Sequence, residues 1–173
     1  MSNERKTEII TRKILTSKQY YIQPNKVEEQ QSDIPNVSKY LKNASKKGNG
    51  QGYPEFIITN SKYPNTIIII ECKPDLTKHI SSTLDKFADY AVDGALLYAS
   101  YLKNGFDVIA IALSGTDEKN LKINVFKWLK DDTQYYDLID QKTNTLVQDI
   151  LSFDDFIQII DYSPQKQKIE YDK

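Results

Sequence analysis

The sequence is poor in the residues that would hold a disulfide framework or a zinc ion. It contains one cysteine, Cys72, and one histidine, His79, in 173 residues. A single cysteine rules out an internal disulfide, and one cysteine with one histidine cannot complete a structural zinc site. Any metal site in this chain must therefore be built from carboxylates.

The sequence also lacks any long apolar run. No segment approaches the roughly 20 apolar residues of a membrane-spanning helix, and residues 1–6 lack the apolar core of a signal peptide. There is no phosphate-binding loop of the Gly-x-x-x-x-Gly-Lys-Ser/Thr type and no adenine methyltransferase motif. These absences predict a soluble, cytoplasmic protein whose own chain supplies neither a nucleotide-driven motor nor a methyltransferase.

Two β-prone runs enclose a turn in the middle of the chain. Residues 56–59 and 66–72 are rich in β-branched side chains, and residues 60–65 have turn composition. This pattern predicts an antiparallel hairpin. Four consecutive isoleucines at 67–70 indicate that its second strand is central and covered on both faces.

Three charged residues fall at one end of this hairpin. Because side chains alternate along a strand, Glu71 and Lys73 share a face, and a turn centred on Tyr63 places Glu55 opposite Glu71. Facing carboxylates repel unless a cation lies between them, and two carboxylates with the Cys72 carbonyl suit Mg²⁺, with Mn²⁺ as a substitute. With Lys73 beside the attacking water, the pattern predicts a phosphodiester hydrolase site.

These residues resemble the PD-(D/E)xK nuclease signature, with Glu55 in the place of the usual aspartate. The resemblance extends over about residues 1–130 and is to the N-terminal nuclease domain of bacterial restriction enzymes, either type I motor subunits or single-chain type II restriction-methylation enzymes. It is carried by Pro54-Glu55 and Glu71-Cys72-Lys73, and by residues 46–58, 70–73, 78–79 and 91–99.

The resemblance implies further roles. The first helix of such nucleases often lends a glutamate to the metal site, which makes Glu8 a candidate third carboxylate. By spacing alone, Glu8 is equally an i,i+4 partner of Arg12 on a solvated face. The family also implies double-stranded DNA as substrate, a helicase or translocase, methyltransferase or specificity domain as partner, and a dimer on DNA for double-strand cutting.

A basic segment precedes the predicted site. Residues 38–53 contain four lysines and no acidic residue, whereas residues 129–161 contain two lysines and eight aspartates, a net charge of −6. The lysines are candidates for contacts with DNA phosphates, with a solvated loop as the alternative. His79 is a further candidate for a phosphate contact, and a plainly solvated histidine is the alternative. The four lysines are Lys39, Lys42, Lys46 and Lys47.

The remaining patterns predict an α/β fold with a restriction-endonuclease-like mixed β-sheet flanked by helices. We expect a nuclease core over residues 1–130, a C-terminal helical extension over 131–163 and a polar tail or linker over 164–173. The expected elements are helices at residues 4–17, 32–44 with Asp33 as a cap, 81–102 and 146–160, a β-prone run at 19–23, and strands at 106–114, parallel to 66–73, and 121–128.

Two other classes of function remain open at this stage. A nuclease-fold module that has lost catalysis and binds nucleic acid, or scaffolds a larger restriction complex, would explain Glu55 in place of aspartate. A structural, ion-paired hairpin would explain Lys73 beside one glutamate, although one lysine cannot neutralise two.

Overall fold

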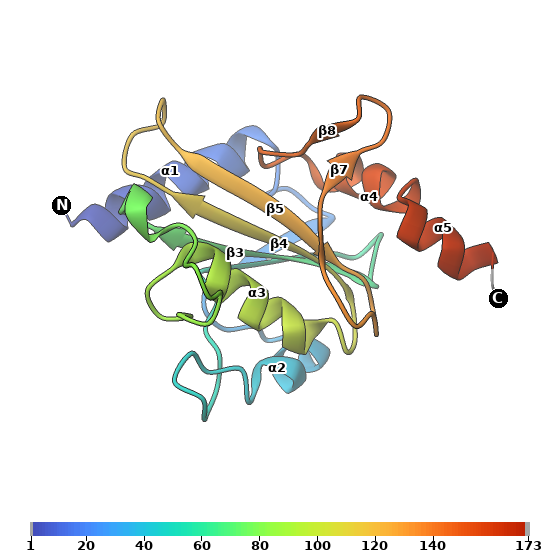
Figure 1. Cartoon of the computed structure of the whole chain (residues 1–173), viewed down its shortest axis with the longest axis horizontal. Coiled ribbons are helices and arrows are strands. Elements are labelled where there is room, and N and C mark those ends of the chain that lie inside the picture. Colours follow the sequence, from blue (N-terminus) through green and yellow to red (C-terminus); the bar gives the residue numbers. More distant parts are fainter. Residues whose placement is uncertain (1, 172–173) are drawn as a thin grey trace.

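Six strands form the central sheet of the protein, in a computed structural model that describes residues 2–171 (Figure 1). The sheet order is β1-β2-β3-β4-β5-β6. Its strands are β1 (Asn25–Glu28), β2 (Phe56–Asn60), β3 (Thr66–Lys73), β4 (Asp107–Ser114), β5 (Lys122–Trp128) and β6 (Tyr136–Asp137), and β7 (Ile139–Asp140) pairs separately with β8 (Thr145–Leu146). The helices are α1 (Asn3–Ser17), α2 (Pro35–Leu41), the 3₁₀ turn η1 (Leu76–Lys78), α3 (Ala91–Leu102), α4 (Phe153–Asp161) and α5 (Pro164–Tyr171).

The predicted hairpin and its register are confirmed. Strands β2 and β3 are antiparallel, with Phe56 opposite Ile70 and Ile58 opposite Ile68, which corresponds to a turn centred on Tyr63. Strand β4 returns through α3 and runs parallel to β3, as a crossover connection requires. Strand β5 is antiparallel to β4. The mixed α/β architecture expected from the sequence is therefore present.

The two faces of the sheet carry separate apolar cores. On one face Ile68 and Ile70 of β3 pack with residues of α1 and α4, and on the other Ile67 and Ile69 pack with residues of α2 and α3. Figure 1 shows this arrangement, with α3 crossing one face of the sheet and α1 on the other. The run of isoleucines is buried on both sides, and the alternation of its side chains places Glu71 on the α3 face and Cys72 on the α1 face.

Two expectations in the first third of the chain are wrong. Residues 19–23 form a turn rather than a strand, because Gln19 takes a left-handed conformation (φ 64°) just after α1, and β1 begins at Asn25. Helix α2 is shorter than expected. It begins after Ile34 without a side-chain cap, since the Asp33 carboxylate instead pairs with Lys26.

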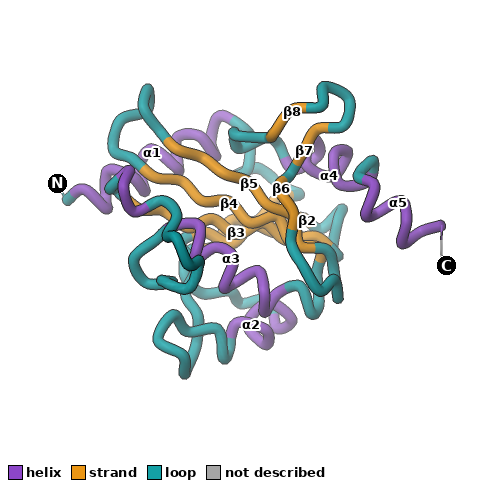
Figure 2. The backbone as a smooth tube through the Cα atoms, in the orientation of Figure 1, coloured by secondary structure: helices purple, strands orange, loops and turns teal. Residues whose placement is uncertain are grey.

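The long helix expected over residues 81–102 begins only at Ala91. Residues 80–90 are an irregular loop that leads into α3 (Figure 2), and Leu84 within it has a left-handed backbone (φ 62°). The apolar spacing of Leu84 and Phe87 is helical, but the Leu84 amide donates a hydrogen bond to the Ser81 hydroxyl oxygen. The physical reason lies in Asp93, which is described with the site below.

The C-terminal third also differs from expectation. The helix expected from residue 146 begins at Phe153, where Ser152 caps it by accepting a hydrogen bond from the Asp155 amide. Residues 164–171, expected as a polar tail or linker, form α5, and residues 172–173 lie outside the described part of the chain. Within residues 2–171 no helix combines the length and the apolar character needed to cross a membrane.

Candidate active site

The predicted carboxylate pair lies where β3 ends and β2 begins. Extending the register of the hairpin by one residue sets Glu55 opposite Glu71. The structure confirms that they are neighbours, because the Glu55 backbone amide donates a hydrogen bond to Glu71 Oε1 at 3.0 Å. The hairpin thus brings together the two acidic residues that the sequence analysis paired.

Glu71 is fully buried, and both of its carboxylate oxygens have partners. Oε1 accepts from the Glu55 amide, and Oε2 accepts from Lys46 Nζ at 2.5 Å. Burying an unpaired charge costs several kcal/mol, so a buried carboxylate is expected to be hydrogen-bonded or ion-paired. In this structure a lysine ammonium supplies the positive charge beside Glu71.

Helix α3 approaches Glu71 so closely that a side chain in place of Gly94, in the first turn of the helix, would crowd the carboxylate. A β-carbon on Gly94 would lie 3.2 Å from Glu71 Oε2, 3.3 Å from Lys46 Cε and 3.0 Å from the Phe87 carbonyl oxygen. Those distances are tighter than ordinary van der Waals contacts. The helix therefore covers the inner side of the carboxylate, which explains how an ionisable group at a strand end is removed from solvent.

Glu55 is only partly buried, and its environment disfavours negative charge. Burial, followed by the nearby carboxylates of Glu71 and Glu8, raises the pKa of Glu55 to about 7, while Lys46 and Lys73 partly oppose the rise. A carboxyl group with this pKa exchanges its proton near neutral pH. A cation placed beside it would favour the ionised form, so the cluster has an excess of acidic groups that a divalent ion would relieve.

Lys73 is the last residue of β3 and lies on the same face as Glu71. Its Nζ donates a hydrogen bond to the Ala88 carbonyl oxygen at 2.7 Å, in the loop that precedes α3. Its charge reaches Glu55, whose pKa it lowers. The strand thus sets Lys73 beside the acidic pair, and the loop holds the end of its side chain.

The alternation along β3 also orients Cys72. Its thiol lies on the opposite face of the sheet, buried and 3.4 Å from Thr11 Oγ1, and burial raises its pKa. The Lys73 carbonyl accepts from the Gly115 amide on the β4 side. Because successive carbonyls of a strand point in opposite directions, the Cys72 carbonyl points toward the β2 side, where Glu55 lies.

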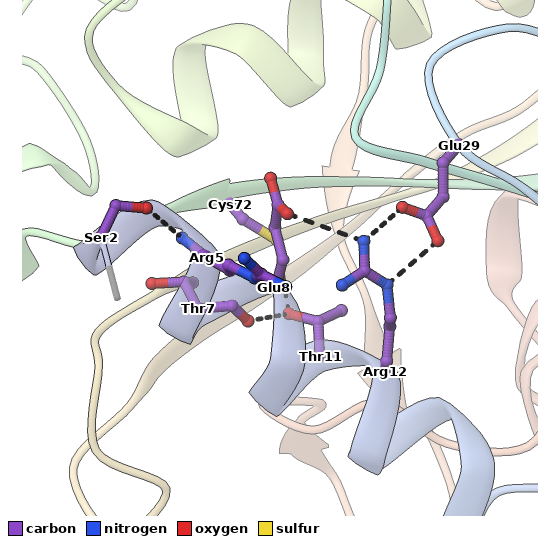
Figure 3. Close-up of polar contacts among 8 residues, drawn as sticks. All are labelled: Ser2, Arg5, Thr7, Glu8, Thr11, Arg12, Glu29 and Cys72. Carbon is purple, nitrogen blue, oxygen red and sulfur yellow. Dashed lines mark hydrogen bonds and ion pairs between the residues drawn. The ribbon is translucent and has the colours of Figure 1, made fainter.

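Glu8 forms the i,i+4 pair that its spacing predicts, whereas its role as a third metal-binding carboxylate stays a prediction. Figure 3 shows it directed toward Arg12, whose Nη2 lies 3.6 Å from Glu8 Oε2, and Arg12 forms a closer pair with Glu29 at 2.5 Å. The i,i+4 pair expected from spacing is therefore present. Glu8 also contributes to the negative potential that raises the pKa of Glu55, so it lies within electrostatic range of the acidic pair.

The donor set at this place consists of two carboxylates and one backbone carbonyl. Within residues 2–171, no group of three or more histidine, cysteine, aspartate or glutamate side chains is arranged to hold a metal ion. The hard oxygen donors of Glu55, Glu71 and the Cys72 carbonyl fit Mg²⁺, which commonly keeps several water ligands and takes few from the protein. An ion bound through Glu71 Oε2 would have to displace the Lys46 ammonium from that oxygen.

The four lysines of the basic segment separate into two environments. Lys39, Lys42 and Lys47 are exposed, on α2, just after it and in the following loop, whereas the Lys46 side chain is 20% exposed and turned toward Glu71. Three of them are thus free to meet a polyanion. Lys46, predicted only as a contact to DNA, is in this structure part of the carboxylate cluster.

The expectation that His79 is solvated or contacts DNA is not met. The ring is buried, with Nδ1 2.7 Å from Ser114 Oγ and Nε2 2.7 Å from Asn124 Oδ1. Burial lowers its pKa. Both ring nitrogens have partners on β4 and β5, so His79 anchors the segment after β3 to the sheet and has no ring nitrogen left for a DNA phosphate.

Sequence reasoning missed Asp93, which is fully buried at the start of α3. Its carboxylate accepts from the Ser81 amide at 3.1 Å, the Lys86 amide at 2.9 Å and the Ser81 hydroxyl. These bonds hold residues 81–86 as a loop and explain why the expected helix does not form there. A carboxylate within the apolar run 91–99 was the available signal.

Comparisons with known proteins add no relative. No protein-family model matches the chain, and neither does any curated protein sequence or solved structure. The assignment of function therefore depends on the geometry described above and on the motif resemblance.

Proposed function

We propose that this chain is a metal-dependent DNA endonuclease domain of the restriction-enzyme type. The observation that carries the proposal is the cluster of Glu55, Glu71 and Lys73, brought together in the order of the PD-(D/E)xK motif at the end of a buried strand. Charged side chains are rarely gathered beside a buried carboxylate without a role, and such clusters are typical of functional sites.

Each residue has a separate task in this proposal. Glu55, Glu71 and the Cys72 carbonyl would hold Mg²⁺ or Mn²⁺. When bound, such an ion polarises the scissile phosphate and lowers the pKa of water. The Lys73 ammonium, held by the Ala88 carbonyl, is positioned to orient the attacking water and to stabilise negative charge on the phosphate oxygens. Glu55 has one methylene more than aspartate but the same charge and oxygen donors.

The context of the site supports DNA as the substrate. The exposed lysines Lys39, Lys42 and Lys47 precede Glu55 and would neutralise backbone phosphates without reading sequence. Target choice, translocation and methylation are then tasks for a specificity, helicase or methyltransferase domain of a larger restriction system. Cutting both DNA strands would require a pair of such sites.

A second function is favoured by two observations. Lys46 already neutralises Glu71, and the described residues offer no cluster of three metal-ligating side chains. A module of this fold that binds nucleic acid or scaffolds a restriction complex without cutting would have the same features. The two proposals differ in one property, which is cleavage.

The test is nicking of supercoiled plasmid by the whole chain in Mg²⁺, in Mn²⁺ and in EDTA, beside the variants Glu71→Gln and Glu4→Gln. Glutamine at 71 keeps the acceptor for the Glu55 amide and removes the charge, so the nicking rate should fall roughly 100-fold or more. Glu4→Gln removes an exposed charge from the first turn of α1 and should cut like the wild type. Equal thermal midpoints would exclude misfolding as the cause.

Three outcomes separate the proposals. Metal-dependent nicking that is lost in Glu71→Gln supports the endonuclease. Nicking by Glu71→Gln at the wild-type rate would contradict the site. Binding of DNA by the wild type without nicking in either metal would favour the non-catalytic module.

A further inference from the structure

Lys46 makes the shortest contact of the candidate active site. Its Nζ lies 2.5 Å from Glu71 Oε2, on a carboxylate that is fully buried, and 5.7 Å from the centre of the Tyr98 ring. The approach of an ammonium to a carboxylate and to an aromatic face is stabilising in both cases, and more so away from water. The Lys46 side chain is thus held by its contacts with Glu71 and Tyr98, whereas the neighbouring Lys47 is exposed.

The segment that carries Lys46 is a loop with little regular structure. Residues 45–50 are closed by a hydrogen bond from the Ser45 amide to the Gly50 carbonyl, and Gly48 and Gly50 take positive φ angles of 90° and 92°. Apart from the glycine itself and its two chain neighbours, no atom lies within 4 Å of a β-carbon built on either glycine. The loop therefore projects into open space while the Lys46 side chain reaches back to Glu71.

An ammonium and a divalent cation cannot both have the same carboxylate oxygen at contact distance. While Lys46 is on Oε2, Glu71 has less negative charge to offer and one oxygen fewer. Binding of a cation through that oxygen requires Lys46 to leave. Cation binding is then weaker by the free energy of the Lys46–Glu71 pair that has to be broken.

A lysine released from Glu71 has an obvious alternative partner at this site. The substrate of the proposed reaction is a phosphodiester, and its anionic oxygens bind lysine ammonium groups. Substrate that takes up the Lys46 ammonium would free Glu71 for the cation. By linkage, each of the two ligands then raises the affinity of the other.

We propose that Lys46 is an internal competitor of the divalent cation at Glu71 and that the substrate phosphate relieves this competition. This inference rests on the proposed function, since it assigns a role to one residue of the same site. In this role Lys46 couples metal binding to DNA binding. The chain binds the metal weakly when DNA is absent and more tightly when a phosphodiester is bound.

The test is the affinity for Mn²⁺, measured by the electron paramagnetic resonance signal of the free ion, without any DNA. Lys46→Met removes the ammonium and keeps the length of the side chain, and should bind Mn²⁺ roughly tenfold more tightly than the wild type. Lys46→Arg keeps the charge and should stay near the wild type. Lys47→Met, which removes an equal charge from the neighbouring exposed position, should change the affinity less than about twofold.

The coupling is tested by adding a short DNA duplex with hydrolysis-resistant phosphorothioate linkages. The duplex should increase the Mn²⁺ affinity of the wild type and change the Mn²⁺ affinity of Lys46→Met little. The Glu71→Gln variant with the same duplex is the control for Mn²⁺ that is bound by the DNA alone. Because Lys46→Met leaves Glu71 without its partner, the thermal midpoint is followed in the same samples, and Mn²⁺ should raise it more in Lys46→Met than in the wild type.

The outcomes distinguish this inference from the function on which it rests. Mn²⁺ binding that depends on Glu71 but is unchanged in Lys46→Met would overturn the role of Lys46 and leave the metal site standing. Mn²⁺ binding that is equal in the wild type and Glu71→Gln would overturn both.

Discussion

The site is explained at the scale of single residues by the cost of burying charge. Glu71 is fully buried at the end of β3, and its two oxygens are met by the Glu55 amide and by Lys46. Gly94 leaves just enough room for this arrangement under α3. Burial and the nearby carboxylates of Glu71 and Glu8 raise the pKa of Glu55 to about 7. Two glutamates of one hairpin thus have different environments.

His79 supplies a prediction about pH. Burial lowers the pKa of its ring below the ordinary value of 6.5, so the unfolded chain binds this proton more readily than the folded one. The contribution of neutral His79 to stability is therefore fully present above pH 6.5 and is lost as the pH falls from there through the lower, folded-state pKa. Urea unfolding at pH 7.5 and pH 5.0 should show this loss.

The matched variant is His79→Gln, which keeps an amide for hydrogen bonding and does not titrate in this range. It should be less stable than the wild type at pH 7.5, and it should lose less stability on acidification. If both proteins lost the same free energy of unfolding between the two pH values, the loss would come from other groups.

At the scale of elements, the parts that were predicted from sequence are those whose pattern and packing agree. The β2–β3 hairpin combines β-branched runs with a turn at its centre, so its register and the facing of Glu55 and Glu71 followed from counting residues. Helix α1 and strands β4 and β5 were predicted for the same reason. Lys46 and Glu71 are 25 residues apart in the sequence. Their contact depends on how the loop after α2 folds against the sheet, which no local pattern encodes.

The loop before α3 is the element where local pattern and tertiary contacts disagree. Its apolar spacing is helical, yet Asp93 holds the Ser81 and Lys86 amides outside a helix. The same loop provides the Ala88 carbonyl that holds Lys73. Asp93 is thus linked to Lys73 through the hydrogen bonds of this loop.

Asp93→Asn should loosen this loop. Asparagine cannot accept all of the hydrogen bonds that the buried carboxylate accepts, and the loss is worth about 2 kcal/mol, or roughly 4 to 8 °C in thermal midpoint. Amide hydrogen exchange should accelerate in residues 81–90 while β3 and β4 remain protected. Asp89→Asn, an exposed position in the same loop, is the control and should leave both measurements unchanged. Unchanged exchange in Asp93→Asn would mean that the loop is held by other contacts.

At the scale of the whole molecule, the chain is close to neutral but its charge is unevenly placed. The exposed lysines belong to residues 38–47, the segment that also supplies Lys46 to the carboxylate cluster, and the acidic residues gather in residues 129–161, which include β6 to β8 and α4. Apolar residues of α4 pack that acidic part against the sheet. Helix α5 is held to the sheet by an ion pair of 2.7 Å between Lys166 and the largely buried Asp107 of β4. The basic part is the one that faces a polyanion in the proposed function.

The measurement that tests the central claim most directly is the single-turnover rate of plasmid nicking in Mg²⁺ by the wild type and by Lys73→Met, with DNA affinity measured in parallel. Methionine keeps the length of the side chain and removes the ammonium that the proposal places beside the scissile phosphate. The rate should fall roughly 100-fold or more, while DNA affinity changes little. Lys78→Met, which removes an exposed charge five residues away, should nick like the wild type. Nicking by Lys73→Met at the wild-type rate would contradict the assignment of this cluster as a nuclease site.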